Sequence, residues 1–179
     1  MRVLGKPAGI FVLLADAAKG FAAVAWLAPD VFYEFIEKDF WTLPFEIRSS
    51  IYHGQIGGFF IIAGIFAVLG HNYTCWLKFK GGKGIATTAG VFLALAPWAL
   101  LVALVVFLLA IVLTRYVSVG SIAAAVALPA TVWVMAPHNL FLGIVTTALG
   151  ALAIYKHKSN IQRLLAGTEN RLGQKKESK

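Results

Sequence analysis

The longest apolar run of this sequence narrows the choice of fold more than any other feature. It runs from Ile85 to Leu113, twenty-nine residues without an Asp, Glu, Lys or Arg. A helix that crosses a bilayer needs about 20 apolar residues, and lipid offers no water to satisfy an unpaired backbone. Since 59% of the 179 residues are hydrophobic, the sequence predicts an all-α integral membrane protein.

The other apolar runs set the number of spans. They cover residues 8–28, 55–69, 118–136 and 140–155. Pro97 interrupts the longest run, so either one tilted helix or two short helices that turn at Ala96 and Pro97 would fit it. A turn would return Arg115 to the side of the lysines near residue 80, as the preference for cytoplasmic Arg and Lys favours. We therefore predict a polytopic bundle of six spans, with four as the alternative.

The basic residues predict the orientation. In the six-span arrangement thirteen Lys and Arg residues lie on one side of the membrane and only Lys38 and Arg48 on the other. The segment 29–52 is acidic and aromatic, as expected of a surface segment on the non-cytoplasmic side. The carboxyl terminus and the lysine-rich segment should therefore be cytoplasmic.

Asp16 and Lys19 lie inside the first apolar run. Three residues apart, they share one helical face and can pair. A structural pair that locks this helix to its neighbours and a functional pair remain equally open.

The segment from Gly70 to Gly90 reads GHNYTCWLKFKGGKGIATTAG. Its glycines allow a ligand close to backbone amides, and its lysines supply positive charge, so it suits a phosphate or carboxylate. It matches neither the Walker pattern nor the dinucleotide fingerprint. A basic loop that only fixes orientation is the other interpretation of this segment.

The carboxyl-terminal segment reads YKHKSNIQRLLAGTENRLG. His157 and Asn160 should share one face of a helix just beyond the last span. The same helix has an apolar stripe that could lie on the bilayer, and Gly167 should end it. Residues 174–179 are predicted to be a disordered basic tail.

Several chemistries are disfavoured. The single Cys75 excludes an internal disulfide and makes a zinc or haem site improbable. On the predicted cytoplasmic side only Glu169 and Glu177 are acidic, too few for an all-protein metal cage, so no metal and no cofactor are expected. The net charge of +8 comes from residues at the ends of apolar runs, which suits orientation better than nucleic-acid binding. Catalysis would rely on positioning, charge and a good leaving group.

Four separated motifs now identify a resemblance. The lysine-rich segment, LADAAKG at residues 14–20, TRYVSVGSI at 114–122 and the carboxyl-terminal segment closely resemble the bacterial acyl-phosphate-dependent glycerol-3-phosphate acyltransferases, nearly end to end. The resemblance implies acyl transfer from acyl phosphate to the 1-hydroxyl of glycerol 3-phosphate, giving lysophosphatidic acid and phosphate. It also implies a multi-pass protein of the bacterial inner membrane whose partners are these two substrates and membrane lipid, with the soluble enzyme that makes acyl phosphate as a further candidate.

The resemblance also suggests roles for individual residues. His157, Lys83 and Asn160 would be catalytic, with His157 or a substrate phosphate oxygen as the base. The remaining residues would bind substrate or support the site: Arg2, Gly81, Gly82, Gly84, Ser118, Ser121 and Glu169.

The sequence departs from its relatives at the amino terminus. Full-length relatives have seven spans, the first followed by a Ser-Gly-Asn-Pro-Gly type loop whose last arginine aligns with Arg2. Residues 1–173 should thus form one acyltransferase domain that lacks this helix and a substrate-binding serine. We expect that the start has been assigned too late; an impaired protein is the alternative. An organic-phosphate transporter or a membrane scaffold is the competing class of function.

Overall fold

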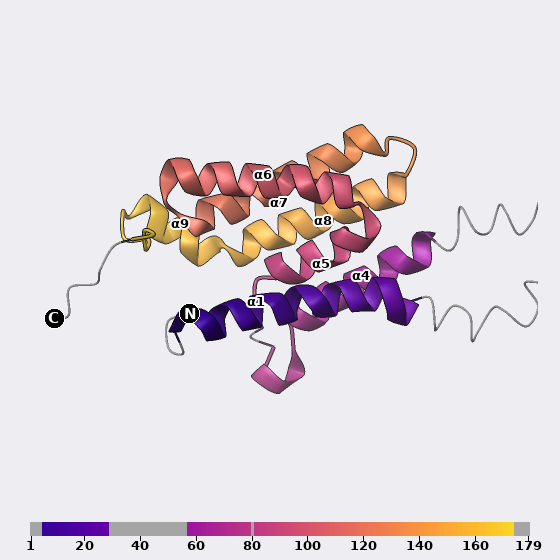
Figure 1. The fold of residues 1–179 in the computed structure, drawn as a ribbon, viewed down its shortest axis with the longest axis horizontal. Helices are drawn as coiled ribbons and strands as arrows, with labels where there is room; N and C mark the ends of the chain where they lie inside the picture. The colour runs from indigo at the N-terminus through magenta and orange to yellow at the C-terminus, as the bar shows by residue number, and fades with distance from the viewer. Residues whose placement is uncertain (1–4, 29–56, 80, 174–179) are drawn as a thin grey trace, which may run out of the picture. The chain divides into compact units, whose positions relative to one another are not determined.

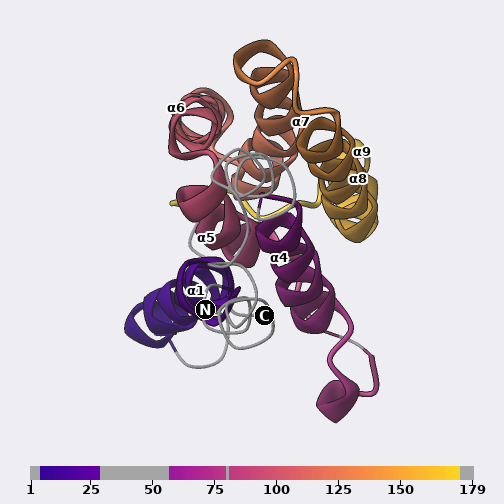
Figure 2. The ribbon, with the colours of Figure 1, turned by 90° about the vertical axis from the view of Figure 1, so that its right-hand side faces the viewer.

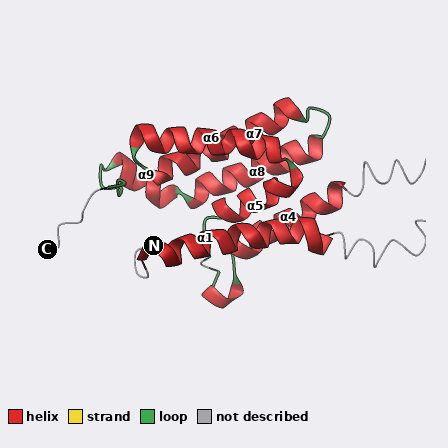
Figure 3. Ribbon diagram, viewed as in Figure 1, coloured by secondary structure: helices red, strands yellow, loops and turns green. Residues whose placement is uncertain are grey.

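The computed structural model describes residues 5–28, 57–79 and 81–173. Within these ranges every regular element is helical, and no strand occurs (Figure 3). The elements are α1 Gly5–Ala22, the π-helical turn η1 Ala23–Leu27, α4 Gly57–Asn72, the 3-10 turn η3 Cys75–Leu77, α5 Ile85–Leu95, α6 Pro97–Thr114, α7 Val117–Met135, α8 Leu140–Lys156 and α9 Lys158–Leu165 (Figure 1). The predicted all-α class is confirmed.

Three of the described helical stretches are long and apolar enough to cross a membrane, namely Pro7–Leu27, α6 and α7. The pair α8 and α9, bent by 52°, makes a fourth if it counts as one span. At a rise of about 1.5 Å per residue the 11-residue α5 covers only about 17 Å, roughly half the hydrocarbon thickness. The multi-span prediction is confirmed, whereas the count of six stays a prediction.

The longest apolar run is broken at Ala96, where the backbone leaves the helical region (φ −152°, ψ 71°). Proline disfavours the helical conformation in the residue before it, but fits the first turn of the next helix. The run therefore forms two helices, not one tilted helix. The contacts also divide the chain here, into Met1–Pro97 (unit 1) and Trp98–Lys179 (unit 2). The prediction of one domain over residues 1–173 stays a prediction.

In unit 1, glycines let α1 pack closely on α5. A Cβ at Gly20 would overlap the carbonyl of Thr87, and one at Gly90 would overlap the carbonyl of Ala17. Each helix therefore presents a glycine to the backbone of the other, a mode of contact that membrane helices favour. This packing places residues 17–20 of α1 beside residues 87–90 of α5.

In unit 2, α7 and α8 form the hairpin that the sequence predicts over residues 118–136 and 140–155. They lie side by side in both views (Figures 1 and 2). A Cβ at Gly150 would lie 2.5 Å from the carbonyl oxygen of Ala125, and the Trp133 indole donates to Thr147 Oγ1 at 3.1 Å. Asn139 caps α8 by accepting from the Leu142 N–H at 3.0 Å. The short loop and this cap fix the hairpin.

Candidate active site

The glycine-rich loop of unit 1 joins α4 to α5 by an unusual backbone path. After η3, Lys78 and Phe79 both adopt left-handed conformations, with φ 52° and 60°. Non-glycine residues rarely do so, and such strain persists only where surrounding contacts impose it. The chain thereby doubles back, and the Gly82 N–H donates to the His71 carbonyl at 3.2 Å. We call residues 81–84 the glycine loop.

The glycines of this loop make room for the end of α4. A Cβ at Gly81 would overlap the His71 carbonyl, and one at Gly82 would overlap the His71 ring. Gly84 has φ 79°, and a Cβ there would lie 2.8 Å from Oδ1 of the buried Asn72. The sequence explains these glycines by ligand access; the structure adds that each lies against His71 or Asn72.

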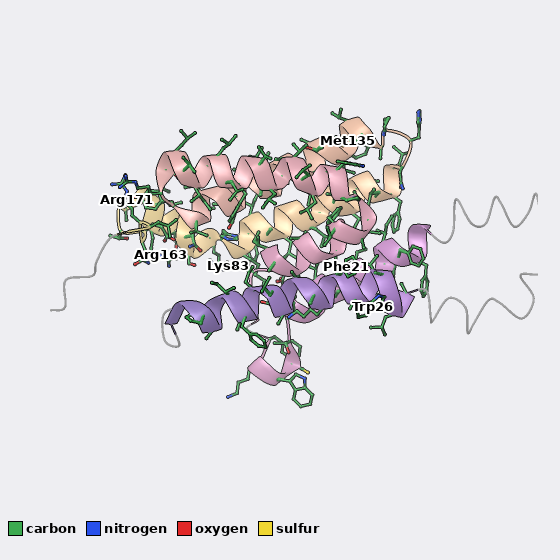
Figure 4. The ribbon with its side chains drawn as sticks, in the orientation of Figure 1. Phe21, Trp26, Lys83, Met135, Arg163 and Arg171 are labelled. Atoms are coloured by element: carbon green, nitrogen blue, oxygen red, sulfur yellow. The ribbon has the colours of Figure 1, made fainter. Side chains whose placement is uncertain are left out.

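The glycine loop ends on the amino terminus of α5. The first N–H groups of a helix have no acceptor within it, and the helix dipole places partial positive charge there. Lys83, half-buried, lies directly before this end and Gly84 caps it (Figure 4). Backbone donors and an ammonium beside them are a suitable arrangement for a phosphate. Lys80 lies outside the described residues.

A polar network lies against this loop. Lys19 Nζ is 2.6 Å from Asp16 Oδ1 and 2.7 Å from His71 Nδ1, and His71 Nδ1 is 3.4 Å from Asp16 Oδ1. The predicted pair of Asp16 and Lys19 is confirmed. His71 was not among the predicted site residues. The available signal was a histidine directly after a glycine in the lysine-rich segment. Its partner Lys19, however, lies 52 residues earlier in the chain.

In unit 2, His157 occupies the bend between α8 and α9. It is 2% exposed, and its backbone N–H donates to the carbonyls of Ala153 and Ile154. Its ring Nδ1 lies 2.7 Å from the Ala153 oxygen. Because a carbonyl only accepts, Nδ1 carries the proton, and Nε2 is the basic nitrogen of the neutral ring. The bend therefore fixes both the position and the tautomer of this imidazole.

Asn160, one turn further on, is held by a buried carboxylate. Its Nδ2 donates to Glu169 Oε1 at 2.8 Å, and Arg163 Nε donates to Glu169 Oε2 at 2.6 Å. Burial raises the pKa of Glu169, but the hydrogen bonds from Asn160 and Arg163, the nearby Ser118 hydroxyl and the Arg163 charge outweigh it and leave the pKa below its usual 4.5. The Ser118 hydroxyl lies near the carboxylate without a hydrogen bond of standard geometry within the described structure.

The chain after α9 folds back onto the start of α7. Gly167, with φ 67°, ends α9 as predicted, and the Gly167 and Thr168 N–H groups donate to the carbonyls of Leu164 and Arg163. This is the Schellman pattern of helix termination. The Leu172 N–H then donates to the Arg115 carbonyl at 2.8 Å.

Two arginines mark this end of unit 2 in Figure 4. Arg163 makes the ion pair with Glu169, and the Arg171 guanidinium lies 5.4 Å from the centre of the Tyr116 ring. These contacts bring Ser118 of α7 to the Asn160 and Glu169 cluster. Ser121, also buried, donates its hydroxyl to the Val117 carbonyl one turn before it.

The structure thus groups the predicted site residues in two clusters. Unit 1 contains Gly81, Gly82, Lys83 and Gly84, and unit 2 contains Ser118, Ser121, His157, Asn160 and Glu169. That the two clusters meet at one substrate stays a prediction. Arg2 lies outside the described residues. Among the described side chains, no three His, Cys, Asp or Glu residues gather as metal ligands.

Together, these features define a polytopic membrane protein whose polar groups suit an anionic substrate. The sequence profile described as glycerol-3-phosphate acyltransferase matches residues 1–167. The chain belongs to this glycerol-3-phosphate acyltransferase family, as the motifs predicted.

Named relatives and solved structures agree. A glycerol-3-phosphate acyltransferase of Endomicrobium trichonymphae is 40% identical over 171 residues, which cover 96% of this chain and 74% of the relative. One from Staphylococcus carnosus is 38% identical over 174 residues, covering 96% and 76%. The structure is similar to PlsY (YgiH), an integral membrane glycerol 3-phosphate acyltransferase. Its glycerol 3-phosphate form matches with TM-score 0.74 and 32% identity, over 96% of this chain and 74% of the PlsY chain. Its lysophosphatidic acid form matches with TM-score 0.72 and 34% identity, over 96% of this chain and 76% of the PlsY chain.

Proposed function

We propose that this chain transfers a fatty acyl group from acyl phosphate to the 1-hydroxyl of glycerol 3-phosphate, giving lysophosphatidic acid and phosphate. The observation that carries the proposal is the family match over residues 1–167, which includes every residue given a role here except Glu169. The similar solved structures are named as forms with glycerol 3-phosphate and with lysophosphatidic acid, the acceptor and the product of this reaction.

The glycine loop and Lys83 bind phosphate in this proposal. The N–H groups at the start of α5 point along the helix axis, and Lys83, directly before this end of the helix, adds a full positive charge. These groups neutralise phosphate, which makes it a better leaving group. Arg2, Ser118 and Ser121 are proposed to bind the rest of the polar substrate.

His157 is the proposed base, and Asn160 orients the acceptor beside it. The Ala153 carbonyl keeps the His157 proton on Nδ1, so Nε2 can take up a proton. Glu169 accepts from the Asn160 amide nitrogen, which fixes the direction of the amide. The amide oxygen is the acceptor that we propose for a hydrogen bond from a substrate hydroxyl.

The chemical step is a direct substitution at the acyl carbon. The hydroxyl oxygen of glycerol 3-phosphate forms the new C–O bond, and the bond between the acyl carbon and the phosphate oxygen breaks with its electron pair going to phosphate. The hydroxyl proton goes to His157 Nε2 or to a phosphate oxygen of the substrate. No protein nucleophile is needed, because acyl phosphate already contains a good leaving group.

The proposed site of this reaction is the cytoplasmic face of the bacterial inner membrane. Thirteen basic residues against two support that orientation. An acyl chain can stay in lipid while the charged groups meet at the surface, and acyl phosphate would arrive from the soluble enzyme that makes it. Units 1 and 2 then act as one acyltransferase domain over residues 1–173.

The test is a reconstituted assay. The complete protein in liposomes is given acyl phosphate and labelled glycerol 3-phosphate, and lysophosphatidic acid is measured by chromatography. We expect product from acyl phosphate and none from an acyl thioester. Uptake of the label into sealed vesicles without acylation would instead support the transporter.

A further inference from the structure

The network of Asp16, Lys19 and His71 has no part in the proposed chemical step. Lys19 Nζ lies between Asp16 Oδ1 at 2.6 Å and His71 Nδ1 at 2.7 Å. An ammonium group can only donate, so His71 Nδ1 accepts and the ring proton is on Nε2. Lys19 therefore fixes the direction of the imidazole, and Asp16 fixes Lys19.

The other edge of the same imidazole lies against Gly82. A Cβ added to Gly82 would overlap His71 Nε2, and it would lie 2.6 Å from Cε1 and 3.0 Å from Cδ2. The three nearest atoms all belong to this ring, and none belongs to Lys19. The Gly82 N–H also donates to the His71 carbonyl. His71 thus contacts Gly82 through both its ring and its backbone.

These groups border a pocket within unit 1, with a volume of about 550 Å³. Its polar edge contains Asp16, Lys19, His71, Gly81 and Gly82, and its other walls are mainly apolar. The side chain of Lys19 is 47% exposed, whereas that of His71 is 15% exposed. The His71 ring is therefore enclosed between Lys19 and the glycine loop at the edge of an open space.

We infer that Asp16 and Lys19 are positioning residues that hold the His71 ring beneath Gly82 and so fix the shape of the glycine loop. The inference rests on the proposed function only in that this loop binds phosphate. A histidine ring can otherwise turn about two side-chain bonds. Without Lys19 the ring loses the nearest partner of its Nδ1, and the loop loses part of the support that holds its wall in place.

The test asks whether Lys19 determines the cost of a methyl group at Gly82. Gly82→Ala is made in the natural background and with Lys19→Met, in the complete protein in lipid-containing detergent. Thermal unfolding, KM for glycerol 3-phosphate and kcat are measured for each. With Lys19 present, the His71 ring cannot move away from the methyl group that Gly82→Ala adds. In this variant Tm should therefore fall, and KM should rise by a larger factor than kcat falls. With Lys19→Met the ring can move, and the added rise in KM should be smaller by at least about threefold.

Gly84→Ala is the matched control. Its Cβ would meet Asn72 Oδ1 at 2.8 Å instead of His71, and φ 79° adds strain. Its effects on Tm and KM should be the same with and without Lys19→Met. Lys158→Met, which removes an exposed lysine from unit 2, should not change the cost of Gly82→Ala.

Two outcomes separate this inference from the proposed function. If the effects of Gly82→Ala and Lys19→Met simply add, the positioning role is wrong even if the enzyme is active. If the natural protein transfers no acyl group, the proposed function is wrong, while the Tm comparison still decides the inference. Should Lys19→Met fail to fold, Asp16→Asn replaces it and should lessen the cost of Gly82→Ala in the same direction.

Discussion

The glycine loop of unit 1 and the His157 cluster of unit 2 hold polar groups in different ways. Around Gly82 and Gly84 the shape depends on absent side chains, because any Cβ would meet His71 or Asn72. Around His157 and Asn160 it depends on hydrogen bonds to the Ala153 carbonyl and to Glu169. Added side-chain atoms should therefore disturb the glycine loop. Loss of a hydrogen-bond partner should disturb the His157 cluster. Substitutions should therefore act differently in the two regions.

The largest expected effect is that of His157→Ala. Loss of a general base should lower kcat by about 10²- to 10⁴-fold, with a smaller change in KM, in the lysophosphatidic acid assay. His138→Ala is the matched control, because His138 is exposed in the loop between α7 and α8. Unchanged kcat in His157→Ala would remove His157 from the mechanism and leave a substrate oxygen as the base.

Lys83→Ala should act mainly on binding. A hydrogen bond to a charged group contributes about 1.5–3 kcal/mol, so KM for the phosphate substrate should rise by about 10- to 100-fold. Measuring this KM at two ionic strengths tests whether the charge of Lys83 matters. Lys83→Arg, which keeps the charge, should restore part of the affinity. Lys158→Ala removes an exposed lysine that lies 5.0 Å from the Tyr155 ring and should leave KM as it is. Equal KM values for Lys83→Ala and the natural protein would contradict the phosphate role.

Glu169→Ala should lower the stability of the folded protein, because the His157 cluster depends on hydrogen-bond partners. It removes the acceptor of both Asn160 and Arg163, and an unsatisfied buried donor costs about 1–3 kcal/mol. Tm should fall by several degrees, and kcat should fall with it because Asn160 loses its orientation. Glu169→Gln keeps one acceptor and should lose less. A larger loss from Glu169→Gln than from Glu169→Ala would show that the hydrogen bonds are not what matters.

The smallest expected effect concerns pH. Because the pKa of Glu169 is lower in the folded protein than its usual 4.5, the unfolded chain binds more protons in this range. The contribution of Glu169 to stability is therefore complete above about pH 4.5 and is lost as pH falls through the folded-state pKa. Tm measured from pH 6 down to pH 3 should fall more steeply for the natural protein than for Glu169→Gln. Parallel curves would contradict this assignment.

The sequence alone predicts much of the local structure, because local rules determine it. Pro137 and its polar neighbours place the hairpin of α7 and α8 to within about one residue, and Pro97 explains the break at Ala96. The pair of Asp16 and Lys19 follows from helical spacing. All of these depend on residues close together in the chain.

Contacts between distant segments were not predictable in the same way. His71 joins Lys19 across 52 residues, and Ser118 meets Glu169 only because the chain after α9 returns to α7. The left-handed Lys78 and Phe79 have no signal in residue type, since neither is glycine or asparagine. Such features depend on packing that spacing within one helix does not determine.

The hydrogen bond between the Leu172 N–H and the Arg115 carbonyl attaches the segment after α9 to the turn between α6 and α7. It involves only main-chain atoms, so it does not depend on the side chain at position 172. Proline alone lacks the donor. A substitution at position 172 by any residue except proline should therefore keep this hydrogen bond.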